Sequence, residues 1–415
     1  MSTAALWIER LANIQRKAGA RIVHLILEEL LDSAEVRIIG DPDRADESRP
    51  SNLIDLRLPN LFWAALILLK PDLMIGQAYV DGHWSVQPER LYDFLNLIRS
   101  RDSSHLRKWF LFSNRFHLVR DTLKQQLFPV RSTRAVVEHY NTDAIFMRMI
   151  LGDSYSYTCA FFENGNLSLE AAQAAKLHKI VERAAIQPGH RVLDLGTGWG
   201  YAPLPLAKEY GCAVTGVTIS KPQVDFCNSR KEPSGCSENL QFVCADYSTY
   251  EPNSPFDRVI SIGMLEHVGK YQYKHFFDKV AQFLTNDGVA LVHSIITEQE
   301  TSPDAWIDRN IFPGGYIPTA HEVVEGIENS GCELQQIYTQ PKSYYFRTLE
   351  LWKKNLFDKR QQCETRLVEL GLASADAIKI MRVWEYFLSA SQLGFSDHGR
   401  CRTAQFVVRR MPRRL

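Results

Sequence analysis

In residues 167–410, short runs of apolar residues alternate along the chain with segments in which apolar residues recur at helical spacing. Short apolar runs rich in Val, Ile and Leu predict buried strands, and the segments between them, with apolar residues about every three or four positions, predict helices. The expected strands are residues 191–196, 213–220, 241–247, 258–264, 289–295, 332–337 and 403–410. The expected helices are residues 169–186, 203–210, 221–231, 271–284 and 321–329. This order predicts an α/β fold with a Rossmann-like, mainly parallel seven-stranded sheet and helices on both faces.

Helical periodicity also fills the long segment before the last expected strand. Residues 345–370 and 375–395 both repeat apolar positions at helical spacing. Because they interrupt the order of strands and helices, we expect them to be helical insertions that form a lid over the carboxyl edge of the sheet.

Residues 1–130 follow a different pattern. They hold amphipathic helical segments at 6–31 and 91–98 and strand-like pieces at 34–39 and 53–58. A glycine-rich nucleotide turn does not occur among them. We therefore expect a smaller N-terminal domain, α+β or mainly helical, over residues 1–130, followed by the α/β domain over residues 131–415.

Composition and charge narrow the class of protein. The formal net charge of the 415 residues is zero, which gives no support for binding to nucleic acid. The eight cysteines lack metal-ligand spacing, so we expect neither a metal site nor a disulfide framework, as in a reducing cytoplasm. Residues 1–20 lack the apolar core of a signal peptide, and the apolar run 61–69 is shorter than the roughly 20 residues that span a bilayer. We therefore expect a cytoplasmic protein that does not cross a membrane.

Residues 99–134 are basic, with nine Lys or Arg against only Asp102 and Asp121, and aromatic side chains interleave with them. One interpretation is a basic-faced helix and linker that joins two domains. The other is a patch that docks on anionic lipid headgroups, where each basic residue contributes about 1 kcal/mol. The residues alone slightly favour the linker.

The expected strand at residues 191–196 runs into a turn with glycines at alternate positions, Gly196, Gly198 and Gly200. Glycines there let the backbone approach a nucleotide closely and adopt positive φ. A dinucleotide site needs another glycine where Tyr201 stands, and an acid after the next strand, which ends in hydroxyls. Hydride transfer is therefore disfavoured. The pattern from Asp194 through the glycines resembles the S-adenosylmethionine (SAM) site of class I methyltransferases.

The loops after the other strands offer polar groups at the same sheet edge. Thr218, Ser220 and Gln223 have the hydroxyls and amide that bind ribose. Asp246 and Tyr247 suit an adenine, although a carboxylate that caps a turn is an equally good interpretation of Asp246. Glu266 and His293 lie at the ends of apolar strands, where polar side chains usually mark a site.

Several motifs then occur together in one order. They are residues 157–162 (Tyr-Thr-Cys-Ala-Phe-Phe), 192–200, 216–220, 261–269, 311–318 and 345–352. Together they resemble the cyclopropane-fatty-acyl-phospholipid synthase family, which includes the mycolic acid cyclopropane synthases. The similarity extends from about residue 139 to residue 408 and is weaker around residues 79–84.

This resemblance implies methylene transfer from SAM to the cis double bond of an acyl chain in a phospholipid, with the ring closed by a bound bicarbonate that removes a proton. It implies a bicarbonate pocket formed by Cys159, Glu266, His293 and Tyr345, with the backbone amide of Ile295 nearby. The SAM contacts that it implies are Tyr157, Thr158, Asp194, Gly196, Gly198, Gly200, Thr218, Ser220, Gln223, Asp246 and Tyr247. It also implies an N-terminal domain that helps form a homodimer and presents the lid to a membrane surface that supplies unsaturated acyl chains.

The sequence departs from the family pattern in places that concern the acceptor. Ser391 stands where a late helix often has a cysteine, and residues 139–145 read His-Tyr-Asn-Thr-Asp-Ala-Ile where His-Tyr-Asp is usual. Two alternatives therefore remain open: methyl addition to an acyl chain without ring closure, and N-methylation of a small amine. A lipid-binding protein with a vestigial SAM fold is disfavoured because the glycine turn is intact.

Overall fold

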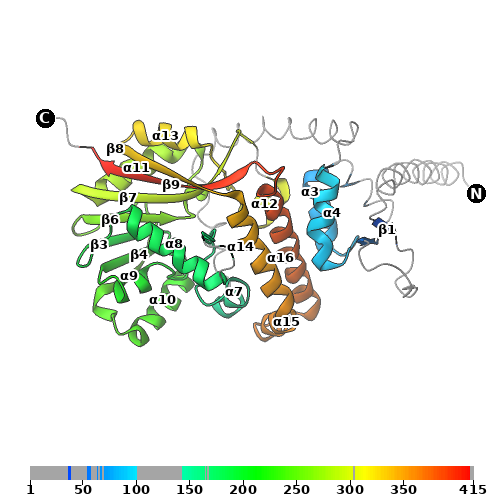
Figure 1. Ribbon diagram of the computed structural model, residues 1–415. Coiled ribbons are helices and arrows are strands. Elements are labelled where there is room, and N and C mark those ends of the chain that lie inside the picture. The colour runs from blue at the N-terminus through cyan, green and yellow to red at the C-terminus, as the bar shows by residue number, and fades with distance from the viewer. Residues whose placement is uncertain are drawn as a thin grey trace, which may run out of the picture.

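A seven-stranded sheet forms the centre of the larger part of the molecule (Figure 1). The computed structural model describes residues 36–38, 54–57, 63, 66–67, 70–100, 143–163, 165, 168–301 and 304–411. The strand order is β5-β4-β3-β6-β7-β9-β8. The strands are β3 (Arg191–Leu195), β4 (Ala213–Thr218), β5 (Leu240–Cys244), β6 (Phe256–Ile262), β7 (Leu284–Thr297), β8 (Cys332–Gln340) and β9 (Cys401–Arg410). Neighbours from β5 to β7 are parallel, and β9 runs antiparallel to both β7 and β8. The mainly parallel seven-stranded sheet is confirmed.

Helices cover both faces of this sheet, as the periodicity predicts. One face packs against α8 (Leu169–Arg183), α9 (Pro203–Lys208) and α10 (Lys221–Ser234) in one hydrophobic cluster. The other packs against α11 (Tyr273–Phe283) and α13 (Ala320–Glu328) in a second cluster. The strands contribute apolar side chains to both clusters because a parallel sheet in a doubly wound fold is buried on both faces.

The helix ends have local causes in the sequence. The Ser168 side chain accepts a hydrogen bond from the backbone amide of Ala171 at the start of α8. Thr319 and Glu322 form a reciprocal capping box at the start of α13. Pro203 begins α9, where a missing amide hydrogen is tolerated.

Three consecutive helices form a separate layer beside the sheet (Figure 1). They are α14 (Lys342–Asp358), α15 (Arg360–Glu369) and α16 (Ser374–Gly394). The sequence predicts one helical stretch over residues 345–370, and the structure divides it at Lys359, whose φ of −108° and ψ of 15° leave the helical region. We refer to α14, α15 and α16 as the lid helices.

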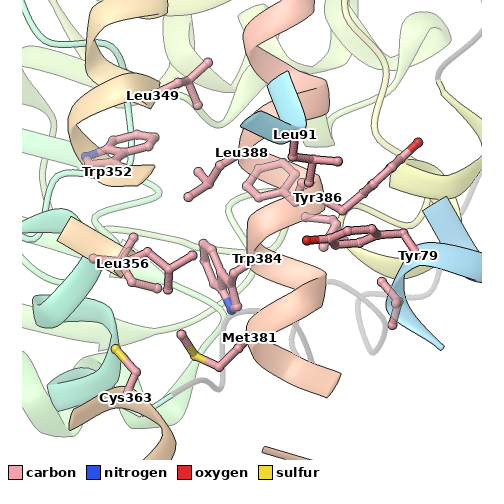
Figure 2. Close-up of a cluster of buried hydrophobic side chains, with 14 of the residues drawn as sticks. Tyr79, Leu91, Leu349, Trp352, Leu356, Cys363, Met381, Trp384, Tyr386 and Leu388 are labelled. Carbon is pink, nitrogen blue, oxygen red and sulfur yellow. The ribbon is translucent and has the colours of Figure 1, made fainter. Parts of the chain in front are cut away.

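The described part of the N-terminal region packs on the lid helices. It comprises a parallel pair, β1 (Val36–Ile38) and β2 (Ile54–Leu56), and the helices α3 (Pro71–Val80) and α4 (Leu91–Ser100). Figure 2 shows Tyr79 and Leu91 meeting Leu388 and Tyr386 of α16 in one hydrophobic cluster. The helix predicted at residues 6–31, most of the basic stretch 99–134 and the predicted boundary at residue 130 lie outside the described residues. The two-domain division therefore stays a prediction.

Among the described residues, the periodicity did not predict α3, α7 (Ala144–Leu151) and α12 (Ala305–Asn310). All three are short, and α7 and α12 begin at aspartates whose side chains accept hydrogen bonds from the first helical amides. Within the described ranges, every helix is too short or too polar to cross a bilayer.

Candidate active site

The glycine turn after β3 has the backbone geometry that its sequence predicts. Gly196, Gly198 and Gly200 have φ values of 80°, 54° and 79°, which side chains with a Cβ rarely adopt. On the next strand, a Cβ at Gly216 would lie 2.7 Å from Thr197 Oγ1. The turn is therefore held close to β4, with its backbone facing the carboxyl edge of the sheet.

A cavity of about 440 Å³ opens beside this turn. We call it the turn cavity. Nine of the predicted SAM contacts line it: Tyr157, Thr158, Asp194, Gly196, Gly198, Thr218, Gln223, Asp246 and Tyr247. Its glycine backbone and polar groups suit a nucleotide, and it lies at the edge of the sheet where the strand order reverses.

Gly200 and Ser220 lie behind this lining and shape it. A Cβ at Gly200 would lie 3.0 Å from Cys227 Sγ on α10, so this glycine allows the helix to approach the turn. Ser220 is fully buried, and its backbone amide donates to Thr218 Oγ1 at 3.2 Å. Thr218 in turn donates to Gln223 Oε1 at 2.7 Å.

Two carboxylates in the turn cavity differ in environment. Asp194 is 3% exposed, and burial raises its pKa to about 7. Asp246 Oδ1 accepts hydrogen bonds from the amide and hydroxyl of Ser248 at 2.9 and 2.8 Å. Asp246 therefore caps a turn and lines the cavity at the same time, so the two interpretations of this residue do not exclude each other.

A second, larger cavity of about 990 Å³ lies between the sheet edge, the lid helices and the helices α3, α4 and α12. We call it the lid cavity. Apolar side chains from several elements form much of its wall: Ile75, Leu95, Ile98, Ile307, Phe312, Leu349, Trp352 and Phe387. Ser391 also lines it. His139 and Tyr140, which the family pattern also concerns, are outside the described residues.

The turn cavity and the lid cavity meet at shared wall residues. These are Tyr157, Thr158, Gly263 and His267. At this junction Gly263 has a φ of 72°, and a Cβ there would lie 2.5 Å from Thr158 Cγ2, so the two residues are in close contact. A group bound beside the glycine turn is thus positioned next to an apolar chamber.

Cys159, Glu266 and Tyr345 come from three separate motifs and His293 from an apolar strand, and all four line the lid cavity. Glu266 Oε1 accepts a hydrogen bond of 2.7 Å from the backbone amide of Ile295. Glu266 Oε2 is buried and has no hydrogen-bond partner among the described residues. Burial raises the pKa of Glu266 to about 6. An orphaned carboxylate oxygen in a cavity is suited to accept a hydrogen bond from a small polar ligand.

Of the other three residues, His293 and Cys159 are neutral near pH 7, and Tyr345 contributes aromatic surface. Burial, with the charges of Lys176 and Arg183, lowers the pKa of His293 to about 3. Burial raises the pKa of Cys159 to about 12, so this residue is a thiol and a poor nucleophile. Tyr345 packs edge-on against Trp352 and tilted against Phe395, with ring centroids 6.2 and 4.4 Å apart.

Sequence reasoning missed the residues of α8 that hold the loop 155–159. Lys176 is fully buried, and its Nζ donates to Ser156 Oγ at 2.7 Å and Thr158 Oγ1 at 2.6 Å. Gln173 Nε2 donates to the backbone oxygen of Thr158 at 3.0 Å. The signal was present: Gln173 and Lys176 occupy the apolar face of a predicted helix, where polar side chains are unusual.

The two cavities offer different polar groups. Within the described ranges, His, Cys, Asp and Glu side chains do not gather in a group that would hold a metal ion. The turn cavity offers glycine backbone and paired hydroxyl and amide groups, which suit a nucleoside. The lid cavity has a largely apolar wall that also includes charged side chains, among them Arg99, Asp304 and Arg400, and the orphaned Glu266 Oε2.

Known proteins match the chain over this region. A family model described as mycolic acid cyclopropane synthetase matches residues 129–406. A cyclopropane-fatty-acyl-phospholipid synthase of Escherichia coli is 31% identical over 79% of this chain and 82% of its own. The solved structure of the cyclopropane synthase MmaA2 from Mycobacterium tuberculosis has a TM-score of 0.60 and 27% identity, over 68% of this chain and 99% of its own. Mycolic acid cyclopropane synthase CmaA1 complexed with SAH and CTAB has a TM-score of 0.60 and 26% identity, over 68% and 100%.

Proposed function

The chain belongs to the mycolic acid cyclopropane synthetase family, and from this premise we propose that it forms a cyclopropane ring on an unsaturated phospholipid acyl chain. Its fold and relatives make it a SAM-dependent methyltransferase. The proposed reaction transfers a methylene group to the cis double bond of the acyl chain. The observation that supports it most is the junction of the turn cavity and the lid cavity at Tyr157, Thr158, Gly263 and His267.

The residues of the turn cavity fit SAM. Gly196 and Gly198 expose backbone to the ligand, Thr218 and Gln223 offer polar groups to the ribose, and Asp246 and Tyr247 line the end proposed for the adenine. When bound, SAM supplies an electrophilic sulfonium methyl group. Thr158 and Gly263 would then lie between the cofactor and the acyl chain, where they set the approach of the double bond.

The lid cavity fits an acyl chain because most of its wall is apolar and aromatic. Attack by an alkene develops positive charge on the acyl chain, and aromatic rings stabilise such charge by about 1–2 kcal/mol when desolvated. At this wall the ring centroid of Tyr157 lies 5.5 Å from that of Trp352 and 6.5 Å from that of Phe387. Their role is to exclude water and face the developing cation.

Bicarbonate is proposed as the base that removes the proton before ring closure. Glu266 Oε2 would accept from its hydroxyl, and His293 and Tyr345 would donate to its oxygens. Cys159 would form a wall of the same pocket as a neutral thiol. The fit rests on one structural fact, the buried and unpartnered oxygen of Glu266.

Two competing products keep the fold and the cofactor. Methyl addition without ring closure would leave a branched acyl chain, and N-methylation would need a small amine acceptor. The volume and apolar lining of the lid cavity favour a lipid over a small amine.

The deciding experiment supplies the purified protein with SAM and vesicles of a monounsaturated phospholipid, and analyses the acyl chains by mass spectrometry. We expect chains heavier by one CH₂ that no longer contain an alkene. Vesicles of the matching saturated phospholipid are the control and should give no product. A methyl-branched product would contradict ring formation, and labelled methyl groups on an added amine would support N-methylation.

The lipid substrate also leads us to propose association with a membrane surface, with residues 1–130 as the lipid-association and dimerisation domain. Flotation with anionic and with neutral vesicles tests the first part. Binding that weakens with added salt on anionic vesicles is expected, because charges attract at short range and salt screens them. Equal flotation on neutral vesicles would contradict a basic docking patch.

A further inference from the structure

Three side chains lie in register across the last strands of the sheet. His293 of β7 pairs with Gln405 of β9, and Gln405 pairs with Tyr338 of β8. Residues that are paired in this way point to the same face of a sheet, here the face covered by α8. Gln405 is fully buried and His293 is 2% exposed, so their polar atoms must be satisfied by neighbours or by a ligand.

Arg183 of α8 fixes which way the Gln405 amide points. The Nη1 of Arg183 donates to Gln405 Oε1 at 2.6 Å. A guanidinium group only donates hydrogen bonds, so the amide atom that faces it must be the oxygen. The guanidinium itself is held in place, with its carbon 4.2 Å from the centre of the Tyr338 ring.

The other end of the same amide faces His293. Gln405 Nε2 lies 3.3 Å from His293 Nδ1. An amide nitrogen only donates, so Nδ1 must accept through its lone pair. The ring is neutral, and its single proton is therefore on Nε2. Among the described residues, the His293 ring makes its hydrogen bond to Gln405 through Nδ1. Its Nε2–H group can therefore donate to a molecule in the lid cavity, which His293 lines.

We propose that Gln405, oriented by Arg183, is a positioning residue that fixes His293 in its Nε2–H tautomer and so makes it a hydrogen-bond donor to an anion in the lid cavity. The donor role rests on the proposed bicarbonate-assisted function. The opposite tautomer would present a lone pair to the anion and repel it. Together with Glu266 Oε2, which accepts, this fixed donor makes the pocket complementary to a hydrogencarbonate ion, which has one hydroxyl group and two anionic oxygens.

The test compares the full-length wild-type protein with Gln405→Glu and Gln405→Leu. Glutamate has nearly the same shape but only accepts hydrogen bonds, so it draws the imidazole proton to Nδ1. Leucine removes the donor without adding an acceptor. Long-range proton–nitrogen spectra of histidine-labelled protein report the tautomer, and a His293→Asn sample identifies the signal among the 12 histidines.

We expect an Nε2–H signal in the wild type, an Nδ1–H signal in Gln405→Glu and a mixture in Gln405→Leu. We also expect Gln405→Glu to need about tenfold more bicarbonate for half-maximal turnover, which corresponds to about 1.4 kcal/mol, because the variant loses a hydrogen bond to a charged group. SAM affinity should stay within about twofold of the wild type, because neither His293 nor Gln405 lines the turn cavity.

Arg183→Met gives a second route if the Gln405 variants fold poorly. It leaves Gln405 in place but frees its amide to rotate, so a mixture of tautomers is expected. A wild-type Nδ1–H signal, or a signal that none of the variants changes, would overturn the tautomer assignment. A changed tautomer with unchanged bicarbonate dependence would overturn the donor role. Because the spectra need no turnover, they separate a failure of this proposal from a failure of ring formation on lipid.

Discussion

The Tyr79 hydroxyl of α3 donates a hydrogen bond of 2.9 Å to Glu385 Oε2 of α16, across 306 positions of the chain. Glu385 is 1% exposed, and its second oxygen accepts from Arg360 at the start of α15. The backbone oxygen of Tyr79 accepts from Arg382 at 2.9 Å. The N-terminal region is therefore attached to the lid helices by a buried polar network, and it supplies part of the lid cavity wall.

Removal of Arg360 is expected to destabilise this network strongly. Arg360→Met leaves Glu385 as a buried carboxylate whose charge is no longer paired, a change that costs about 3–5 kcal/mol in other proteins. Tyr79→Phe removes a single hydrogen bond and should cost about 1–2 kcal/mol. Chemical denaturation, read by fluorescence, gives both values.

The double variant Arg360→Met with Glu385→Met is the control for this assignment. It removes both charges, so much of the lost free energy of unfolding should return. A double variant no more stable than Arg360→Met would show that the loss comes from packing and not from the unpaired carboxylate.

Gly263→Ala is expected to reduce both SAM affinity and turnover, because a Cβ at this junction would lie 2.5 Å from Thr158 Cγ2. The matched control is Gly269→Ala. Gly269 also has a positive φ, 87°, but open space surrounds its Cβ position. Both variants share the backbone strain of about 1–2 kcal/mol, so the difference between them isolates the displacement of Thr158. Titration calorimetry with SAM measures it, and equal affinities would mean that the contact with Thr158 is unimportant.

The parallel sheet and the glycine turn could be predicted from the sequence because both depend on local patterns. Apolar period identifies strands such as β3, and the spacing of Gly196, Gly198 and Gly200 specifies a backbone shape. Many residues that line the turn cavity could be predicted for the same reason, because the loops after parallel strands meet at the carboxyl edge of the sheet.

Contacts between distant segments could not be predicted in this way. Nothing local shows that Gln405 pairs with His293, because the pairing depends on the antiparallel register of β9. The helix α3 was not predicted because its buried residues, Gly76, Ala78 and Tyr79, do not follow a simple amphipathic period. They are buried by packing against α12 and α16. Lys176, which supports loop 155–159, is a different case: its position on the apolar face of α8 was a local signal, but its partners Ser156 and Thr158 come from another segment.

Glu266→Gln is expected to lower turnover by about 100-fold, because in the proposed function Glu266 holds the bicarbonate that acts in proton transfer. Glutamine can still accept from the amide of Ile295, but the end that replaces Oε2 becomes a donor and opposes the hydroxyl of a hydrogencarbonate ion. SAM affinity should hardly change, because Glu266 lines only the lid cavity. Steady-state kinetics and calorimetry separate the two effects. A large loss of SAM affinity would place Glu266 in the wrong cavity.

The same carboxylate predicts an acid limb in the rate profile. Burial raises the pKa of Glu266 to about 6, so its acceptor form is lost as the pH falls below 6. Turnover of the wild type should therefore decrease about tenfold per pH unit below that value. With the concentration of bicarbonate ion held equal at each pH, this limb should be absent in Glu266→Gln, and an identical limb in both proteins would assign it to another group.

Lys176→Met is expected to change how stability depends on pH. Burial lowers the pKa of Lys176 from 10.5 to about 7. Between these values the unfolded chain binds a proton that the folded chain does not, so raising the pH favours the folded state by up to about 1.4 kcal/mol per unit. The free energy of unfolding of the wild type, minus that of Lys176→Met, should therefore rise between pH 7 and pH 9.

Urea denaturation of both proteins at pH 7, 8 and 9 measures this difference, in which most other titrations cancel. The neighbouring Cys159 thiol, with a pKa raised to about 12 by burial, stays protonated throughout. Lys176→Met should also weaken SAM binding, because the hydrogen bonds that hold Ser156 and Thr158 against the turn cavity are lost. If the difference in unfolding free energy stayed constant with pH, Lys176 would be equally protonated in the folded and unfolded states. Its role would then be confined to the geometry of the loop.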